Sequence, residues 1–108
     1  MKNDTDVSNV TMLKDSIDYA DNSIISKAII KKPSGSVTLF SFDKGEELSE
    51  HTAPFDALVQ ILDGEAEITL DSKKNIVCAG NSILLPANVP HALKADKKFK
   101  MLLTMIRS

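Results

Sequence analysis

Cysteine, glycine, proline and aromatic side chains are all scarce in this 108-residue sequence, and tryptophan is absent. The single cysteine excludes an internal disulfide, and its place in the apolar run Ile76-Val77-Cys78 predicts a small buried side chain rather than a catalytic thiol. The apolar runs are far shorter than the ~18 residues that a membrane helix needs, and the N-terminus lacks the pattern of a secretory signal. We therefore expect a cytoplasmic protein that has no membrane partner.

An excess of charge of either sign is also lacking. Thirteen Lys and Arg residues stand against fifteen Asp and Glu residues, for a formal net charge of −2, and the two signs alternate along the chain. Nucleic-acid binding usually needs a basic face, so we expect no nucleic-acid partner. A chain of this length folds as one domain that leaves roughly a third of its unfolded surface exposed, so burial against a partner adds to its stability.

The first 22 residues differ in composition from the rest. Residues 1–22 are predicted to form an arm that is disordered at its polar start and has a short helix within residues 12–19. Residues 23–108 are predicted to form the folded domain. From Ile24 onward, short runs of Ile, Val, Leu and Phe alternate with turn residues such as Pro33-Ser34-Gly35 and Ala79-Gly80. This pattern predicts an all-β sandwich or barrel.

The stretch around Asp63-Gly64 predicts a β-hairpin, because Asp-Gly between two strand-like runs favours a two-residue turn. In that register Leu62 pairs with Glu65, and one face of the hairpin is continuously apolar. We expect this face to point into the core; it comprises Ala57, Val59, Ile61, Ala66, Ile68 and Leu70.

Other strands carry large apolar residues on both faces. Leu39 and Phe40 are neighbours on one such strand, and the runs at residues 24–30 and 101–106 are similar. A sheet with two apolar faces needs a second layer on each side, and the interior of a barrel supplies only one of them. We expect a homodimer to cover the outer face. The alternative is that the N-terminal arm folds back over it.

One segment resembles the first sequence motif of the cupin superfamily, which runs from a glycine through His-x-His and a glutamate to a second glycine. Five residues separate Gly45 from His51, and six residues separate Ala57 from Gly64. Ala53 takes the place of the family's second histidine and Ala57 that of its glutamate. The motif is therefore kept in its spacing, but two of its metal ligands are replaced.

A second segment resembles the other cupin motif, a glycine followed by Pro-x-Gly, a histidine and an asparagine. Gly80, Pro86 and His91 have the family's spacing. Asn88 takes the place of the inner glycine, and Ala95 takes the place of the asparagine. The two motifs in this order imply the cupin fold, an all-β double-stranded β-helix or jelly-roll-like conical barrel, preceded here by the short N-terminal arm.

Cupins usually bind one divalent metal through the ligands of both motifs, so the resemblance implies a metal site here only through His51 and His91. Sites for zinc or iron need at least three protein ligands, and two imidazoles hold such an ion weakly. Asp56 is the nearest carboxylate, but strand alternation points it outward unless a bulge at Pro54-Phe55 redirects it. A weakly bound divalent transition metal is therefore left open.

We expect the barrel to bind a small organic ligand beside the two histidines. Alanines at two ligand positions enlarge the cavity and make its wall more apolar, as is typical of small-molecule sites. The predicted ligand-binding residues are His51, Ala53, Phe55, Ala57 and His91. The alternative is a metal-dependent cupin enzyme of the dioxygenase, isomerase or decarboxylase type, in which His51 and His91 are the metal ligands and the candidate catalytic residues.

Overall fold

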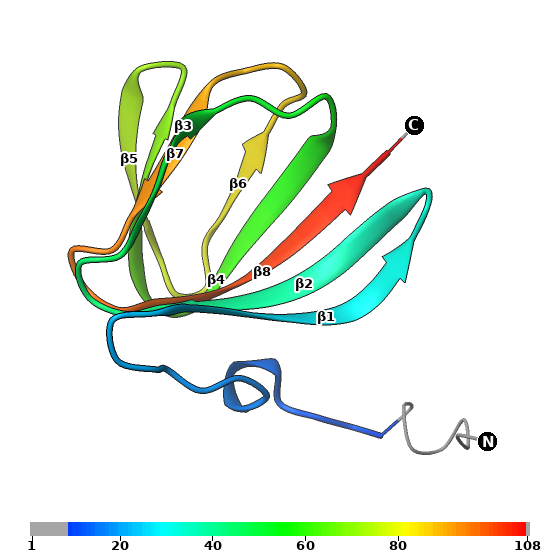
Figure 1. The fold of residues 1–108 in the computed structure, drawn as a ribbon, viewed down its shortest axis with the longest axis vertical. Helices are drawn as coiled ribbons and strands as arrows, with labels where there is room; N and C mark the ends of the chain where they lie inside the picture. The colour runs from blue at the N-terminus through cyan, green and yellow to red at the C-terminus, as the bar shows by residue number, and fades with distance from the viewer. Residues whose placement is uncertain (1–8, 108) are drawn as a thin grey trace.

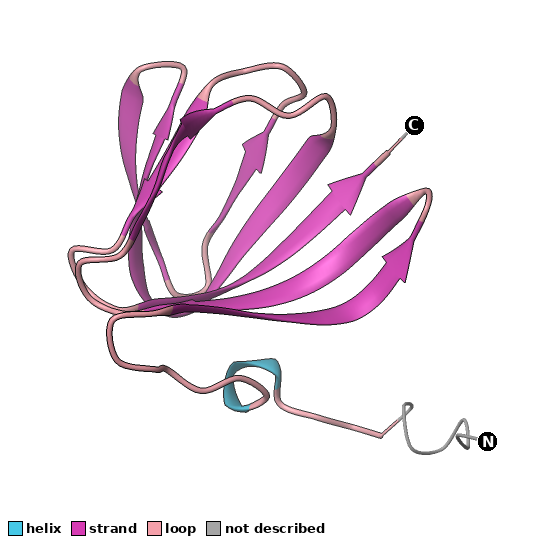
Figure 2. Ribbon diagram, in the orientation of Figure 1, coloured by secondary structure: helices cyan, strands magenta, loops and turns pink. Residues whose placement is uncertain are grey.

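The structure is a computed structural model and describes residues 9–107. In this range a three-residue 3-10 helix precedes eight antiparallel strands (Figure 1; Figure 2). No helix among these residues is long and apolar enough to cross a membrane. The expected all-β class is confirmed. The elements are η1 (Leu13–Asp15), β1 (Ile24–Lys32), β2 (Gly35–Phe42), β3 (Glu47–His51), β4 (Asp56–Leu70), β5 (Lys73–Cys78), β6 (Ser82–Leu85), β7 (His91–Lys94) and β8 (Phe99–Ile106).

The strands form two antiparallel sheets that share β4. The wide sheet has the order β1-β2-β8-β4-β6, and the narrow sheet has the order β3-β7-β4-β5. Figure 1 shows the two sheets facing each other and diverging from the end of the molecule where β4 bends. Two facing sheets joined in this way make the double-stranded β-helix that the cupin resemblance implies.

β4 is one continuous strand, so the predicted hairpin at Asp63-Gly64 is wrong. Asp63 pairs with Lys100 and Gly64 pairs with Phe99, both on β8. An extra residue at Leu62 makes a β-bulge between two pairs of this register, and a bulge reverses which side chains face inward. The predicted apolar set is nevertheless buried on both sides of the bulge, at Ala57, Val59, Ile61, Ala66 and Ile68.

The core lies between the two sheets. Phe42 and Phe99 stack there with their ring centroids 4.5 Å apart, and both side chains are fully buried. Val77 of β5 packs in the same core, and strand alternation therefore turns Cys78 outward. The predicted burial of Cys78 is wrong, because this thiol is exposed on the strand position paired with Glu65.

Residues 9–22 run along the outer face of the wide sheet (Figure 1). Ile17 is buried there against Leu39 and Leu102. The Tyr19 hydroxyl donates a hydrogen bond of 2.6 Å to Asp63 Oδ2. For these residues the structure shows the alternative arrangement, in which the arm covers part of its own sheet. The predicted disorder falls on residues 1 to about 10, and residues 1–8 of this stretch lie outside the described residues.

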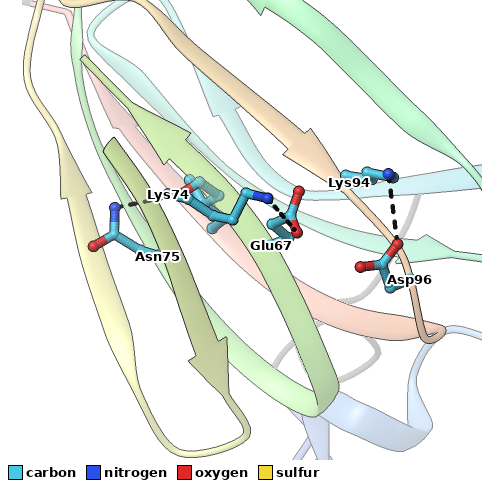
Figure 3. A network of polar contacts seen from close by, with 6 residues as sticks. Glu67, Lys74, Asn75, Lys94 and Asp96 are labelled. Atoms are coloured by element: carbon cyan, nitrogen blue, oxygen red, sulfur yellow. Dashed lines mark hydrogen bonds and ion pairs between the residues drawn. The ribbon is translucent and has the colours of Figure 1, made fainter. Parts of the chain in front are cut away.

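The outer face of the narrow sheet carries charged side chains (Figure 3). Lys74 Nζ lies 3.6 Å from Glu67 Oε1, and Lys94 Nζ lies 3.7 Å from Asp96 Oδ1. Lys94 and Asp96 are both exposed, and an exposed pair contributes about 0–1 kcal/mol to stability. The Glu67 side chain is only 14% exposed. The outer face of the wide sheet differs in carrying exposed apolar side chains such as Ile30, Leu58 and Leu84.

Candidate functional site

A cavity of about 90 Å³ lies between the two sheets. His51 and His91 have the only polar side chains among the described residues that line it. The apolar part of the wall comes from strands of both sheets and includes Phe40, Leu48, Val59, Leu85, Leu93 and Leu103. A concave apolar wall with a few convergent polar groups is the usual form of a small-molecule site.

The two histidines lie side by side at one edge of the cavity. His51 ends β3, His91 begins β7, and the two residues are directly paired across these strands. Their ring centroids are 4.4 Å apart and the ring planes are inclined by 68°. His91 is 8% exposed, whereas His51 is open to solvent. The structure thus brings together the two side chains that the sequence singled out.

Each imidazole is held by a backbone carbonyl of its own chain segment. His51 Nδ1 lies 2.8 Å from the carbonyl oxygen of Ser49, and His91 Nδ1 lies 3.1 Å from that of Val89. In both cases the acceptor is two residues earlier in the chain. These bonds fix the orientation of the rings and leave Nε2 of each ring for other partners.

The other predicted ligand-binding residues, Ala53, Phe55 and Ala57, line the same cavity. The Ala53 carbonyl accepts a hydrogen bond of 2.7 Å from the Asn88 N–H, which ties the loop after β3 to the loop before β7. The Arg107 guanidinium lies over the Phe55 ring, 5.0 Å from its centroid. All five predicted residues therefore surround one cavity, and their binding of a ligand stays a prediction.

Asn88 explains why the second motif tolerates the loss of its inner glycine. Its φ is +66°, in the left-handed region that favours glycine. Asparagine adopts this region more readily than other residues with a side chain, because its short amide can bond to the local backbone. The loop that leads to His91 therefore keeps its shape without the glycine.

The described cavity wall also holds residues that were not predicted as site residues, among them Leu48 and Leu85, and Arg107 lies beside it against Phe55. Leu48 lines the wall because the register of β3 shifts between Leu48 and His51, whereas strict alternation from His51 would turn it outward. Leu85 faces inward, but Ile83-Leu84-Leu85 is apolar throughout and does not show its inner face. Arg107 belongs to no motif, and only the structure brings it to Phe55.

The residues present do not fit the divalent metal that cupins usually hold. Among the described residues, no group of three or more His, Cys, Asp or Glu side chains is placed to hold an ion. Asp56, the nearest carboxylate in the sequence, is exposed, and its Oδ1 accepts a hydrogen bond of 2.8 Å from the Ala87 N–H. Two imidazoles are one ligand short of the smallest protein set for zinc or iron.

Known families and structures resemble this chain along most of its length. Residues 38–107 match the family model described as a cupin domain. A conserved protein of unknown function from Streptococcus pyogenes is 37% identical, with a TM-score of 0.89, and the match covers 94% of this chain and 89% of that one. A cupin superfamily protein from Desulfitobacterium hafniense is 32% identical, with a TM-score of 0.88, over 94% of this chain and 93% of that one.

A longer protein also matches. A cupin 2 conserved barrel domain protein from Leptotrichia buccalis is 45% identical, with a TM-score of 0.84, over 87% of this chain and 46% of that one. This chain therefore corresponds to about half of the Leptotrichia protein. None of the curated proteins matches the sequence.

Proposed function

The chain belongs to the cupin domain family, and from this premise we propose that its barrel binds a small organic molecule beside His51 and His91. The observation that carries the proposal is the pair of imidazoles, 4.4 Å apart, at an otherwise apolar cavity. Apolar walls supply binding energy by excluding water, and the few polar groups orient the ligand. Ala53 and Ala57 leave open the volume that the larger metal-binding histidine and glutamate of the cupin motif would occupy.

A fragment survey by NMR tests this proposal on the full chain. We expect bound fragments to shift the backbone resonances of cavity residues such as Leu48 and Met105. Ala53→Leu fills the cavity and should abolish these shifts, because overlap with a rigid wall leaves no room for the fragment. Ala79→Leu is the matched control, since Ala79 is exposed and outside the cavity. Hits that gather elsewhere on the surface, or persist in Ala53→Leu, contradict the proposal.

The metal-dependent enzyme is the competing hypothesis, and metal analysis separates the two. Protein purified without added metal should contain far less than one equivalent of any transition metal, because two imidazoles bind such ions weakly. The opposite result would be a full equivalent that is lost in His51→Ala and in His91→Ala. That result would favour a metalloenzyme, and turnover lost in the same two variants would establish it.

We further propose that a second copy of the chain covers the outer face of the wide sheet. One row of cross-strand partners runs over this face from β1 to β6, and none of its side chains is charged. The row comprises Ile30, Val37, Thr104, Leu58 and Leu84. Ile30 is 48% exposed, Leu58 36% and Leu84 54%. Five strands span about 19 Å at the usual interstrand spacing, so the row crosses the whole sheet. The arm covers the neighbouring row at Leu39 and Leu102, and Val37 packs against that cluster. Ile30, Leu58 and Leu84 are left exposed.

Charge supports a second copy as the occupant. The next row on the same face has Lys32 on β1 and Asp56 on β4, with Gly35 and Ile106 between them. A two-fold axis parallel to β8, the middle strand, places Lys32 beside the partner's Asp56 and Ile30 against the partner's Leu84. The face is then complementary to itself, as an isologous dimer requires.

A further inference from the structure

The tautomers of the two cavity histidines follow from their backbone contacts. Ser49 and Val89 present carbonyl oxygens to Nδ1 of His51 and His91, at 2.8 and 3.1 Å. A carbonyl oxygen only accepts hydrogen bonds, so Nδ1 must carry the hydrogen in both rings. In its neutral form an imidazole has one N–H, so in that form Nε2 of each ring is a bare acceptor.

The two imidazole rings border the same small cavity. The rings are a directly paired couple on β3 and β7 with centroids 4.4 Å apart, and both line the cavity. Within the described part of the chain, no side chain or backbone group donates to either Nε2. Among the described residues the cavity wall contributes no other polar side chain, so a ligand that displaces water from the two Nε2 atoms has to supply their donors itself.

This pattern selects the polar end of the ligand. A carboxylate would bring its lone pairs against those of two Nε2 atoms, and neutral imidazoles give it no donor in return. An ammonium group would leave water without a carboxylate on the cavity wall to compensate its charge. A neutral group with two adjacent hydrogens on oxygen or nitrogen satisfies both acceptors at once.

The cavity also limits the size of the apolar end. Its volume is about 90 Å³. An engineered protein cavity of about 150 Å³ holds benzene, so the body that enters this cavity is smaller than a benzene ring, with about four or five carbon atoms. Hydroxyl or amide donors at the histidine edge leave the rest of such a molecule against Leu48, Leu93 and Leu103.

We propose that the cavity ligand is a small neutral molecule with paired hydrogen-bond donors, such as a vicinal diol or a primary amide, on a short branched apolar body. The inference rests on the proposed ligand-binding function and names the chemical class of the ligand. The donors bond to Nε2 of His51 and of His91, and the apolar body fills the space opened by Ala53 and Ala57.

Two NMR measurements at pH 8 test this inference on the full chain. The first is the long-range ¹H–¹⁵N correlation of the imidazoles, which we expect to show the Nδ1–H tautomer for both residues. The second is a titration with isovaleramide, 3-methylbutane-1,2-diol and isovalerate. Isovaleramide and isovalerate have the same shape but opposite hydrogen-bonding character. The amide and the diol should shift cavity resonances. Isovalerate should bind about tenfold more weakly, because its carboxylate donates no hydrogen bond to Nε2 and its charge is repelled by the nitrogen lone pairs.

Variants on β3 connect the titration to the histidine pair. His51 is exposed, so His51→Leu removes one acceptor without disturbing the core, and it should weaken isovaleramide about tenfold. Glu50→Leu is the matched control, because Glu50 is an exposed residue of the same strand and does not line the cavity, so this variant should bind like the parent chain.

The outcomes separate the ligand class from the proposed function. An Nε2–H tautomer, or isovalerate binding as tightly as isovaleramide, overturns the donor-pair inference but leaves a ligand-binding cavity. If none of the three probes shifts a cavity resonance while other fragments of the survey do so, the ligand class is again wrong and the function stands. If no fragment of any kind binds there, both proposals fail.

Discussion

At Gly64 the chain has a φ of +74°, and a methyl group at this position would overlap the carbonyl oxygen of Lys98. The residue therefore meets two requirements that only glycine satisfies, a left-handed backbone and a close approach of β8. Asp-Gly is a frequent hairpin turn because of this same backbone freedom. Here β8 continues past the corner and pairs with Asp63 and Gly64, so the chain bends and does not reverse.

Gly64→Ala should lower the free energy of unfolding by about 3 kcal/mol, from the left-handed backbone and the steric overlap together. Gly80→Ala is the control, since Gly80 has a φ of +90° but no atom within 4 Å of an added methyl group. That variant should lose only the backbone part, about 1–2 kcal/mol. Urea denaturation measures both, and equal losses would show that the approach of Lys98 is unimportant.

The individual site residues were predictable to different degrees. The resemblance to the two cupin motifs identified His51 and His91, because it implies that both positions project into the same cavity. Burial of single side chains was less certain where several neighbours are apolar. Val77 and Cys78 are such neighbours, and only pairing with β4 decides that Val77 faces the core.

The N-terminal arm is held on the wide sheet by one apolar anchor and several polar contacts. Ile17 is buried, and Tyr19 donates to the Asp63 carboxylate. Lys98 and Lys100 place their Nζ atoms 4.6 and 4.9 Å from the centroid of the Tyr19 ring. Burial and the bond to Asp63 raise the pKa of the Tyr19 phenol well above its usual value. The arm is thus fastened most firmly while Tyr19 is neutral.

Tyr19→Phe should lower stability at pH 8 by about 1 kcal/mol, the net value of a partly exposed hydrogen bond. Because the folded-state pKa of Tyr19 is raised, the unfolded chain loses the phenolic proton first as pH rises above about 10. The stability advantage of the parent chain over Tyr19→Phe should therefore shrink above pH 10. Urea midpoints of both proteins at pH 8 and pH 11 measure this, and an advantage that grows with pH contradicts it.

In β4 and in the N-terminal arm, the sequence predicted the local strand pattern but not the contacts with distant residues. The alternation in β4 was readable from the sequence on each side of Leu62. The bulge that joins the two halves was not, because a bulge is defined by the count of residues on the partner strand β8. The arm likewise has too few apolar residues for the sequence to show which surface it covers.

At the scale of the whole molecule, the proposed dimer buries the row from Ile30 to Leu84. The proposed dimer should be present at micromolar concentration in sedimentation velocity. Leu84→Lys places a charge within the row and should weaken dimerisation at least about tenfold, since a desolvated unpaired charge is costly. Ile76→Lys is a matched control, because Ile76 is also 54% exposed but lies on the narrow sheet.

A monomeric parent chain, or equal weakening by the two lysine variants, would contradict the dimer. The described arm does not replace the partner in this test, because the apolar cluster that it joins does not include Leu84, which is 54% exposed. A dimer that persists in Leu84→Lys would place the interface elsewhere on the molecule.

The sequence by itself predicted the all-β class and the inward apolar set of β4, and its resemblance to the cupin motifs predicted that the two histidines share a cavity and that two of the family's metal ligands are replaced. These features depend on local alternation and on motif spacing, which are properties of short stretches of chain. The tertiary structure alone decided that Asp63-Gly64 is a corner, that Cys78 faces outward and that the arm covers part of the wide sheet. Each of these features depends on strand pairing or packing with residues that are distant in the chain. The sequence of a short segment does not show which distant residues those are.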